Sequence, residues 1–153
     1  MGLNFYLKLL FFLLILVWIV GILIEFLIPQ FEILTMLYPS LKIFYSHVCH
    51  QQFEKTISID GHSLLVCSRC FGIYSGSLVS SFILIFFSLI RIHRIKYLIL
   101  GTLPMIIDVI LYSIGIYFYS KQIAFFSGFL FGMVGIVYIY NGMQILLEKP
   151  EKN

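Results

Sequence analysis

Long apolar runs separated by short polar segments dominate this chain. A helix needs about 20 apolar residues to cross the hydrocarbon core of a bilayer. Four runs reach that length, at about residues 5–28, 64–90, 97–119 and 123–147. Pro29 ends the first run, and a tight turn at residues 120–122 makes the last two an antiparallel hairpin. The pattern predicts an all-α fold, an integral membrane bundle of four transmembrane helices forming one domain over residues 1–153.

The composition agrees with a lipid environment. Apolar residues make up 61% of the chain and charged residues 11%, whereas soluble domains carry about 25% charged residues. The mean hydropathy is +1.03. The net charge of +3 is small, and the basic residues flank apolar runs, so they indicate membrane topology and no nucleic-acid surface. The first run is longer than the apolar part of a signal peptide, so we expect it to remain as an anchor.

Lysine and arginine positions predict the orientation. Basic residues collect on cytoplasmic sides of membrane proteins. Four spans put both termini on one side, and that side carries the larger basic set: Lys8, Arg91, Arg94, Lys96, Lys149 and Lys152. The opposite side carries Lys42, Lys55, Arg69 and Lys121. We therefore expect a multi-pass protein of the cell membrane with cytoplasmic termini and an extracytoplasmic segment between the first two spans.

The segment between the first two spans has two parts. Residues 31–45 are apolar but interrupted by charge and proline, so an interfacial or re-entrant segment is expected rather than a span. Residues 51–63 are polar and predict a water-facing loop. Asp60-Gly61 is a turn signal, consistent with a short hairpin across residues 56–65.

Residues 45–76 hold all three cysteines and three of the four histidines. Zinc takes four thiolate or imidazole ligands in a tetrahedron. Cys67 and Cys70 lie one helical turn apart at the start of the second span, where both side chains face one way. Cys49 and His50 can complete a Cys₃His set, and His47 and His62 are spare imidazoles. The pattern therefore predicts a zinc site of Cys49, His50, Cys67 and Cys70.

Two other interpretations of these cysteines stay open. A CxxC at a helix start is also the geometry of thiol–disulfide exchange, with Cys49 as a partner thiol, which predicts a membrane thiol–disulfide relay. Alternatively, the cysteines form one structural disulfide or remain inert buried thiols. Covalent haem attachment is disfavoured because Phe71 stands where the CxxCH motif needs histidine.

Asp108 lies near the middle of the third apolar run. A carboxylate inside the membrane is costly and marks a functional-site candidate by default. Arg69 is the expected counter-charge, and the two are our candidate catalytic residues. We expect a polar pocket around them that also includes Gln51, Tyr74, Ser75 and Ser127. A purely structural buried ion pair is the alternative, so whether the protein is an enzyme stays open.

Small residues recur at helical spacing in two runs. Gly72 and Gly76 form a GxxxG pattern extended by Ser80, and Gly128, Gly132 and Gly135 form a similar face. Such faces let another helix approach closely. They predict a homo-oligomer or a membrane partner, and a third functional hypothesis: a non-enzymatic membrane partner or transporter subunit.

Four segments together resemble a known family: SHVCHQ, VCSRCFGIYSG, LPMIID and SGFLFG, spanning residues 46–132. They are similar to the CHQ and CxRCxGIY signature of a family of small prokaryotic membrane proteins filed as domain of unknown function 2085. The resemblance implies a membrane protein in which Gln51, Arg69 and Asp108 belong to the site. It implies no particular reaction.

Overall fold

The computed structural model describes residues 2–86 and 95–148. Its long helices are α1 (Gly2–Ile22), α4 (Ser68–Phe86), α5 (Ile95–Ser113) and α6 (Lys121–Glu148). Between α1 and α4 lie the short helices α2 (Ile24–Leu27) and α3 (Leu34–Ser46), the 3₁₀ turn η1 (Phe53–Lys55), and the strands β1 (Thr56–Ile59) and β2 (His62–Cys67). Stretches of the four long helices are long and apolar enough to cross a membrane, which confirms the predicted fold class.

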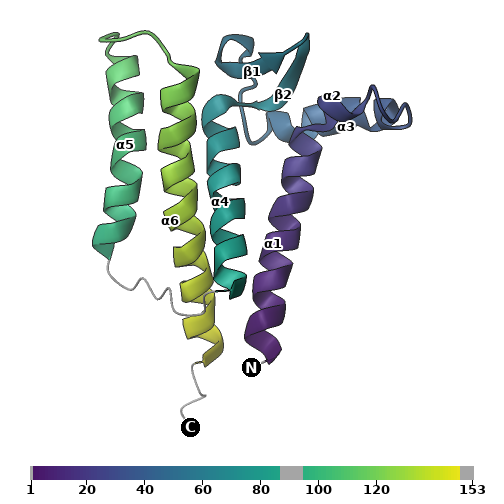
Figure 1. Ribbon diagram of the computed structural model, residues 1–153. Coiled ribbons are helices and arrows are strands. Elements are labelled where there is room, and N and C mark those ends of the chain that lie inside the picture. Colours follow the sequence, from purple (N-terminus) through teal and green to yellow (C-terminus); the bar gives the residue numbers. More distant parts are fainter. Residues whose placement is uncertain (1, 87–94, 149–153) are drawn as a thin grey trace.

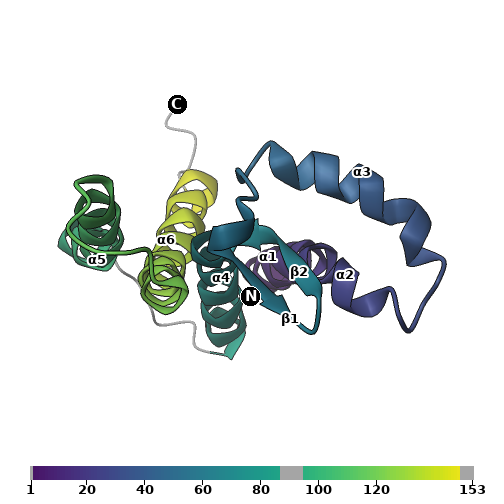
Figure 2. The same ribbon diagram turned by 90° about the horizontal axis from the view of Figure 1, so that it is seen from above.

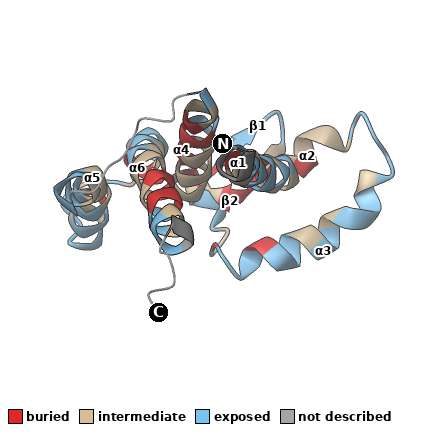
Figure 3. Ribbon diagram, turned by 90° about the horizontal axis from the view of Figure 1, so that it is seen from below, coloured by how far each residue is buried: buried red, intermediate tan, exposed pale blue. Residues whose placement is uncertain are grey.

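The four membrane helices stand side by side in one row rather than around a central axis. Figure 2 shows the order α5, α6, α4, α1 across the molecule. The packing agrees, because α4 contacts both α6 and α1, whereas α5 packs mainly against α6. Figure 3 shows α5 largely exposed, with buried residues where α4 and α6 meet and also on α2, α3 and β2. The row therefore has its tightest contact at its centre.

Glycines make the α4–α6 contact possible. A Cβ atom added at Gly72 or Gly76 would overlap backbone oxygens of α6, and one added at Gly128 or Gly132 would overlap backbone oxygens of α4. Four of the predicted small residues therefore bring the two helices together within one chain, whereas a Cβ at Gly135 would meet no atom within 4 Å. A partner or second copy, which stays a prediction, has to use another surface.

A small cap covers one end of the row. Figure 1 shows α3 lying crosswise beyond the end of α1, with the β1–β2 hairpin above α4. The strands pair antiparallel, and Asp60 and Gly61 form their turn with φ of 51° and 81°. The expected hairpin is thus present. One face of α3 contacts the body, whereas Met36, Leu37, Ile43 and Phe44 are exposed, as in a helix that lies at a membrane interface.

Tyr45 fastens α3 to α1. Its side chain is 2% exposed, and its hydroxyl donates a 2.8 Å hydrogen bond to the backbone oxygen of Trp18. The ring also packs against the indole of Trp18, with centroids 5.1 Å apart. The kink at Leu23, between α1 and α2, turns the chain toward this contact.

We expect Tyr45→Phe to lower the free energy of unfolding by about 0.5–1.5 kcal/mol, because it removes the hydrogen bond that the buried Tyr45 hydroxyl donates to the Trp18 backbone oxygen. Thermal or denaturant unfolding in detergent measures this loss. Tyr6→Phe is the matched control, since Tyr6 is 67% exposed and should give no change. Equal effects of the two substitutions would show that the Tyr45 hydroxyl contributes nothing specific.

Three expected boundaries differ from the structure. The second membrane helix begins at Ser68 rather than near residue 64, because residues 62–67 pair with β1 as a strand. The first ends at Ile22 rather than near residue 28. The third ends at Ser113, and residues 114–120 form a connection with Gly115 at φ 77° instead of a tight turn. The expected end of the second span near residue 90 and most of the basic loop lie outside the described residues.

Candidate metal centre

Three cysteine side chains meet where the cap joins the row of helices. The sulfur atoms of Cys49, Cys67 and Cys70 all lie within 4.8 Å of one another, and all three cysteines are free thiols. Cys49 is buried, and the other two are half-buried. Within the described part of the chain, this is the group of potential metal ligands that the fold assembles.

The local structure explains why these residues meet. Cys67 is the last residue of β2, and Cys70 lies in the first turn of α4, which follows β2 directly. Cys49 follows the end of α3. Gln51 holds this segment in place, because its amide nitrogen donates to the backbone oxygens of Lys42, at 3.0 Å, and Leu65, at 2.9 Å. Its φ of 48° is unusual for a residue other than glycine.

Hydrogen bonds within the trio favour a thiolate at Cys49. The thiols of Cys67 and Cys70 donate to its sulfur and lower the pKa of Cys49 to about 2. The backbone N–H of Cys67 adds a contact of 3.1 Å. The same interaction with Cys49 raises the pKa of Cys67, because the proton that Cys67 donates is held in place. A metal ion needs thiolate ligands and replaces such protons when it binds.

The histidines lie apart from the thiols. His50 is exposed and belongs to no group with the three sulfur atoms, although it lines the same cavity. His47 is exposed, and its Nδ1 lies 2.8 Å from the backbone oxygen of Ile43. His62 packs against the ring of Phe26. The structure thus brings three of the four predicted ligands together and leaves His50 outside that group.

A cavity of about 390 Å³ opens beside the thiols. Its walls combine the three cysteines with polar and basic side chains from the cap and from α4: Val48, Cys49, His50, Gln51, Gln52, Lys55, Cys67, Arg69 and Cys70. Gln51 and Arg69, which were predicted as site residues, therefore do line a cavity with the cysteines.

Arg69 joins this cavity to the buried carboxylate of α5. Its Nη2 lies 2.5 Å from Oδ2 of Asp108, whose side chain is 2% exposed. The other carboxylate oxygen, Oδ1, accepts a hydrogen bond from the hydroxyl of Tyr117. Asp108 is the buried residue of α5, so this contact ties an otherwise peripheral helix to the centre of the row. The predicted Arg69–Asp108 pair is present.

Two further tyrosines of the α5–α6 hairpin support the basic side chains. The amine of Lys55 lies 4.6 Å from the ring centroid of Tyr112 and 5.5 Å from that of Tyr119. The guanidinium of Arg69 lies 5.8 Å from the ring of Tyr119. Burial raises the pKa of Tyr119 to about 12, so this phenol stays neutral and supports both cations through its ring.

The other predicted pocket residues lie elsewhere. Tyr74 packs against Trp18, and Ser127 lines a separate groove between α5 and α6 and donates to the backbone oxygen of Ala124. Ser75 is half-buried on α4. Sequence reasoning missed Lys55 and Tyr117. A lysine in a polar loop and a tyrosine in an apolar run carry no local signal of a shared site.

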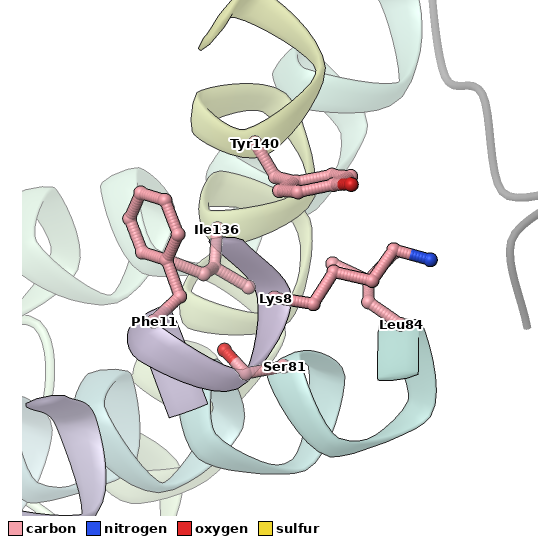
Figure 4. Close-up of a pocket in the computed structure, with 6 residues that line it drawn as sticks. All are labelled: Lys8, Phe11, Ser81, Leu84, Ile136 and Tyr140. Carbon is pink, nitrogen blue, oxygen red and sulfur yellow. The ribbon is translucent and has the colours of Figure 1, made fainter. Parts of the chain in front are cut away.

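A second cavity, near the ends of the helices that lie away from the cap, is much smaller. It holds about 10 Å³, the size of a single water site, and lies between α1, α4 and α6. Figure 4 shows Lys8, Ser81 and Tyr140 around it. The amine of Lys8 lies 5.7 Å from the ring centroid of Tyr140. This cavity is too small for a ligand larger than one water molecule.

A family model described as "Predicted membrane protein (DUF2085)" matches residues 49–138, which is more than half of the chain. The chain belongs to this family. The DUF2085 match begins at Cys49 and includes the other two cysteines, Arg69 and Asp108. It leaves out α1, α2 and α3, so the family region contains the thiols and the ion pair but not the helices that cover them.

Two curated relatives are archaeal. An uncharacterised protein of Methanocaldococcus jannaschii is 37% identical over 98 residues, covering 62% of this chain and 63% of the relative. An uncharacterised protein of Methanothermobacter thermautotrophicus is 48% identical over 33 residues, covering 22% of this chain and 30% of the relative. The chain thus spans less than two thirds of the length of either relative. No solved structure matches this DUF2085 protein.

Proposed function

We propose that this membrane protein binds a zinc ion through Cys49, Cys67 and Cys70, at the extracytoplasmic face. The observation that carries the proposal is the mutual distance of the three sulfurs, within 4.8 Å. Tetrahedral zinc with Zn–S bonds of about 2.3 Å separates its sulfur ligands by about 3.8 Å. Only small side-chain shifts separate the two arrangements. The uneven distribution of lysine and arginine supports the orientation.

The cavity beside the thiols defines two possible forms of the site. With His50 as fourth ligand the coordination is closed, as in structural zinc sites. If the fourth coordination position of the zinc ion faces the cavity, the site resembles catalytic zinc sites, which keep one position for water or substrate. A bound zinc would supply Lewis acidity there, while Arg69, oriented by Asp108, provides positive charge at the same wall. We favour the open form, because His50 stands outside the sulfur trio.

Elemental analysis of the purified protein tests the proposal. We expect about one zinc ion per chain in the wild type, and less than about a tenth of that in Cys49→Ser, Cys67→Ser and Cys70→Ser, since three-thiolate binding fails when one ligand is removed. His62→Ala, which removes an imidazole outside the trio, is the control and should keep full zinc. His50→Ala keeps zinc if the site is open and loses it if the site is closed.

A thiol–disulfide relay is the second candidate, because three free thiols in mutual contact and a stabilised Cys49 thiolate are also what disulfide exchange needs. A protein free of zinc whose cysteines change alkylation state with the applied redox potential would establish the relay and refute the zinc site. Zinc that protects all three thiols from alkylation would refute the relay.

A further inference from the structure

We infer that the cavity beside the three thiols binds the phosphate group of a phospholipid headgroup. The inference rests on the proposed function, since it assigns the ligand class of the same site. Three observations carry it: the charge of the cavity wall, the way its cations are held, and its depth relative to the membrane helices.

The cavity wall carries two cations. Of its nine lining side chains, Lys55 and Arg69 are cationic and none is a carboxylate, while the three cysteines would bring one net negative charge as thiolates on a zinc ion. Gln51 and Gln52 line the wall as well. A volume of about 390 Å³ is ample for a phosphate with its ester substituents. Cationic groups with polar neighbours in a concave site are the chemistry that recognises phosphate.

The cations are positioned without being fully neutralised. Lys55 rests over the rings of Tyr112 and Tyr119, which hold its amine but carry no net charge, and no described carboxylate forms an ion pair with it. Arg69 engages Asp108 through Nη2, and its Nε is buried without a hydrogen-bond partner among the described residues. Lys55 therefore supplies the positive charge that no described carboxylate neutralises, with the paired Arg69 beside it at the wall.

The depth of the cavity matches that of lipid phosphates. The membrane-spanning stretches of α4 and α6 begin at Ser68 and Lys121, and a hydrogen bond of 2.5 Å from the Ser68 hydroxyl to the Lys121 backbone oxygen places these ends side by side. Arg69 and Cys70 follow Ser68 directly, so the cavity lies at the boundary between hydrocarbon and headgroups. The anionic group abundant at that depth is the phosphate of the lipid itself.

The test uses the full-length, zinc-loaded protein in a non-ionic detergent. Native mass spectrometry measures the dissociation constant of dihexanoyl phosphatidylglycerol, with dihexanoylglycerol as the probe that lacks phosphate, and inorganic phosphate as a competitor. We expect the phosphatidylglycerol to bind, the diacylglycerol not to bind, and Lys55→Gln to weaken binding about tenfold, the effect of one charged hydrogen bond. Lys55→Arg, which keeps the charge, should retain most of the affinity.

Lys42→Gln is the matched control, because Lys42 also lies over a tyrosine ring, 5.8 Å from the centroid of Tyr38, but does not line this cavity. Equal losses in the two lysine variants, or equal binding of the two lipids, would overturn the inference. Tight binding of inorganic phosphate alone would also overturn it, since the bound phosphate would then not need to belong to a lipid.

Zinc content is measured on every sample. Loss of zinc in Lys55→Gln would show that Lys55 only balances the thiolates, and a zinc-free wild type would refute the proposed function separately.

Discussion

Gly132→Ala is expected to separate α4 from α6 and to lower the free energy of unfolding by about 1–3 kcal/mol or more. The added Cβ would overlap the backbone oxygen of Ile73, and a backbone atom in a packed helix cannot move aside without shifting the helix. Overpacking of a tight contact costs energy of this order. The contact joins the two central helices of the row, so its loss also affects the thiols at the start of α4.

Gly135→Ala on the same helix is the control, because a Cβ there meets no atom within 4 Å and alanine favours the helix. Thermal unfolding of both variants in detergent measures the difference, and zinc content shows whether the site is disturbed. Comparable midpoints for the two variants would mean that the α4–α6 contact is not as close as described, or that these faces serve a second chain.

Asp108→Asn is expected to lower the free energy of unfolding by about 3 kcal/mol. Removing one partner of a buried ion pair leaves the other uncompensated, which costs about 3–5 kcal/mol. The lower end applies because the Arg69 side chain is 21% exposed beside the cavity. The tyrosine hydroxyl of Tyr117 also loses its charged acceptor. Denaturant unfolding measures the effect, with Asn141→Ala on α6 as a control polar substitution away from the pair.

The double variant Arg69→Met with Asp108→Leu separates a structural from a functional role. Apolar replacement of both partners of a buried pair is often neutral or stabilising, so most of the lost stability should return. Phosphatidylglycerol should bind more weakly to this stable double variant than to the wild type, because the cavity has lost the Arg69 cation. Restored stability together with unchanged lipid binding would reduce the pair to a structural element.

Features that depend on neighbouring residues could be derived from the sequence. Membrane helices follow from apolar composition over about 20 residues, because their backbone hydrogen bonds are local and lipid demands apolar side chains. The hairpin turn at Asp60-Gly61 follows in the same way, since both residues tolerate positive φ. The Cys67-x-x-Cys70 spacing likewise identified two thiols that lie close together, although Cys67 ends β2 and only Cys70 lies on α4, so the expected shared helix face is wrong.

Cysteine content and intramembrane charge predicted two groupings of distant residues, Cys49 with the other thiols and Arg69 with Asp108. Other contacts between distant segments were decided by the tertiary structure alone. It left His50 outside the thiols and brought Lys55 onto tyrosines of the α5–α6 hairpin. It also turned the glycine faces inward against each other, although their spacing equally suits a second chain. The physical reason is that spacing along a helix fixes which side chains share a face, whereas the partner of that face depends on how the whole chain packs.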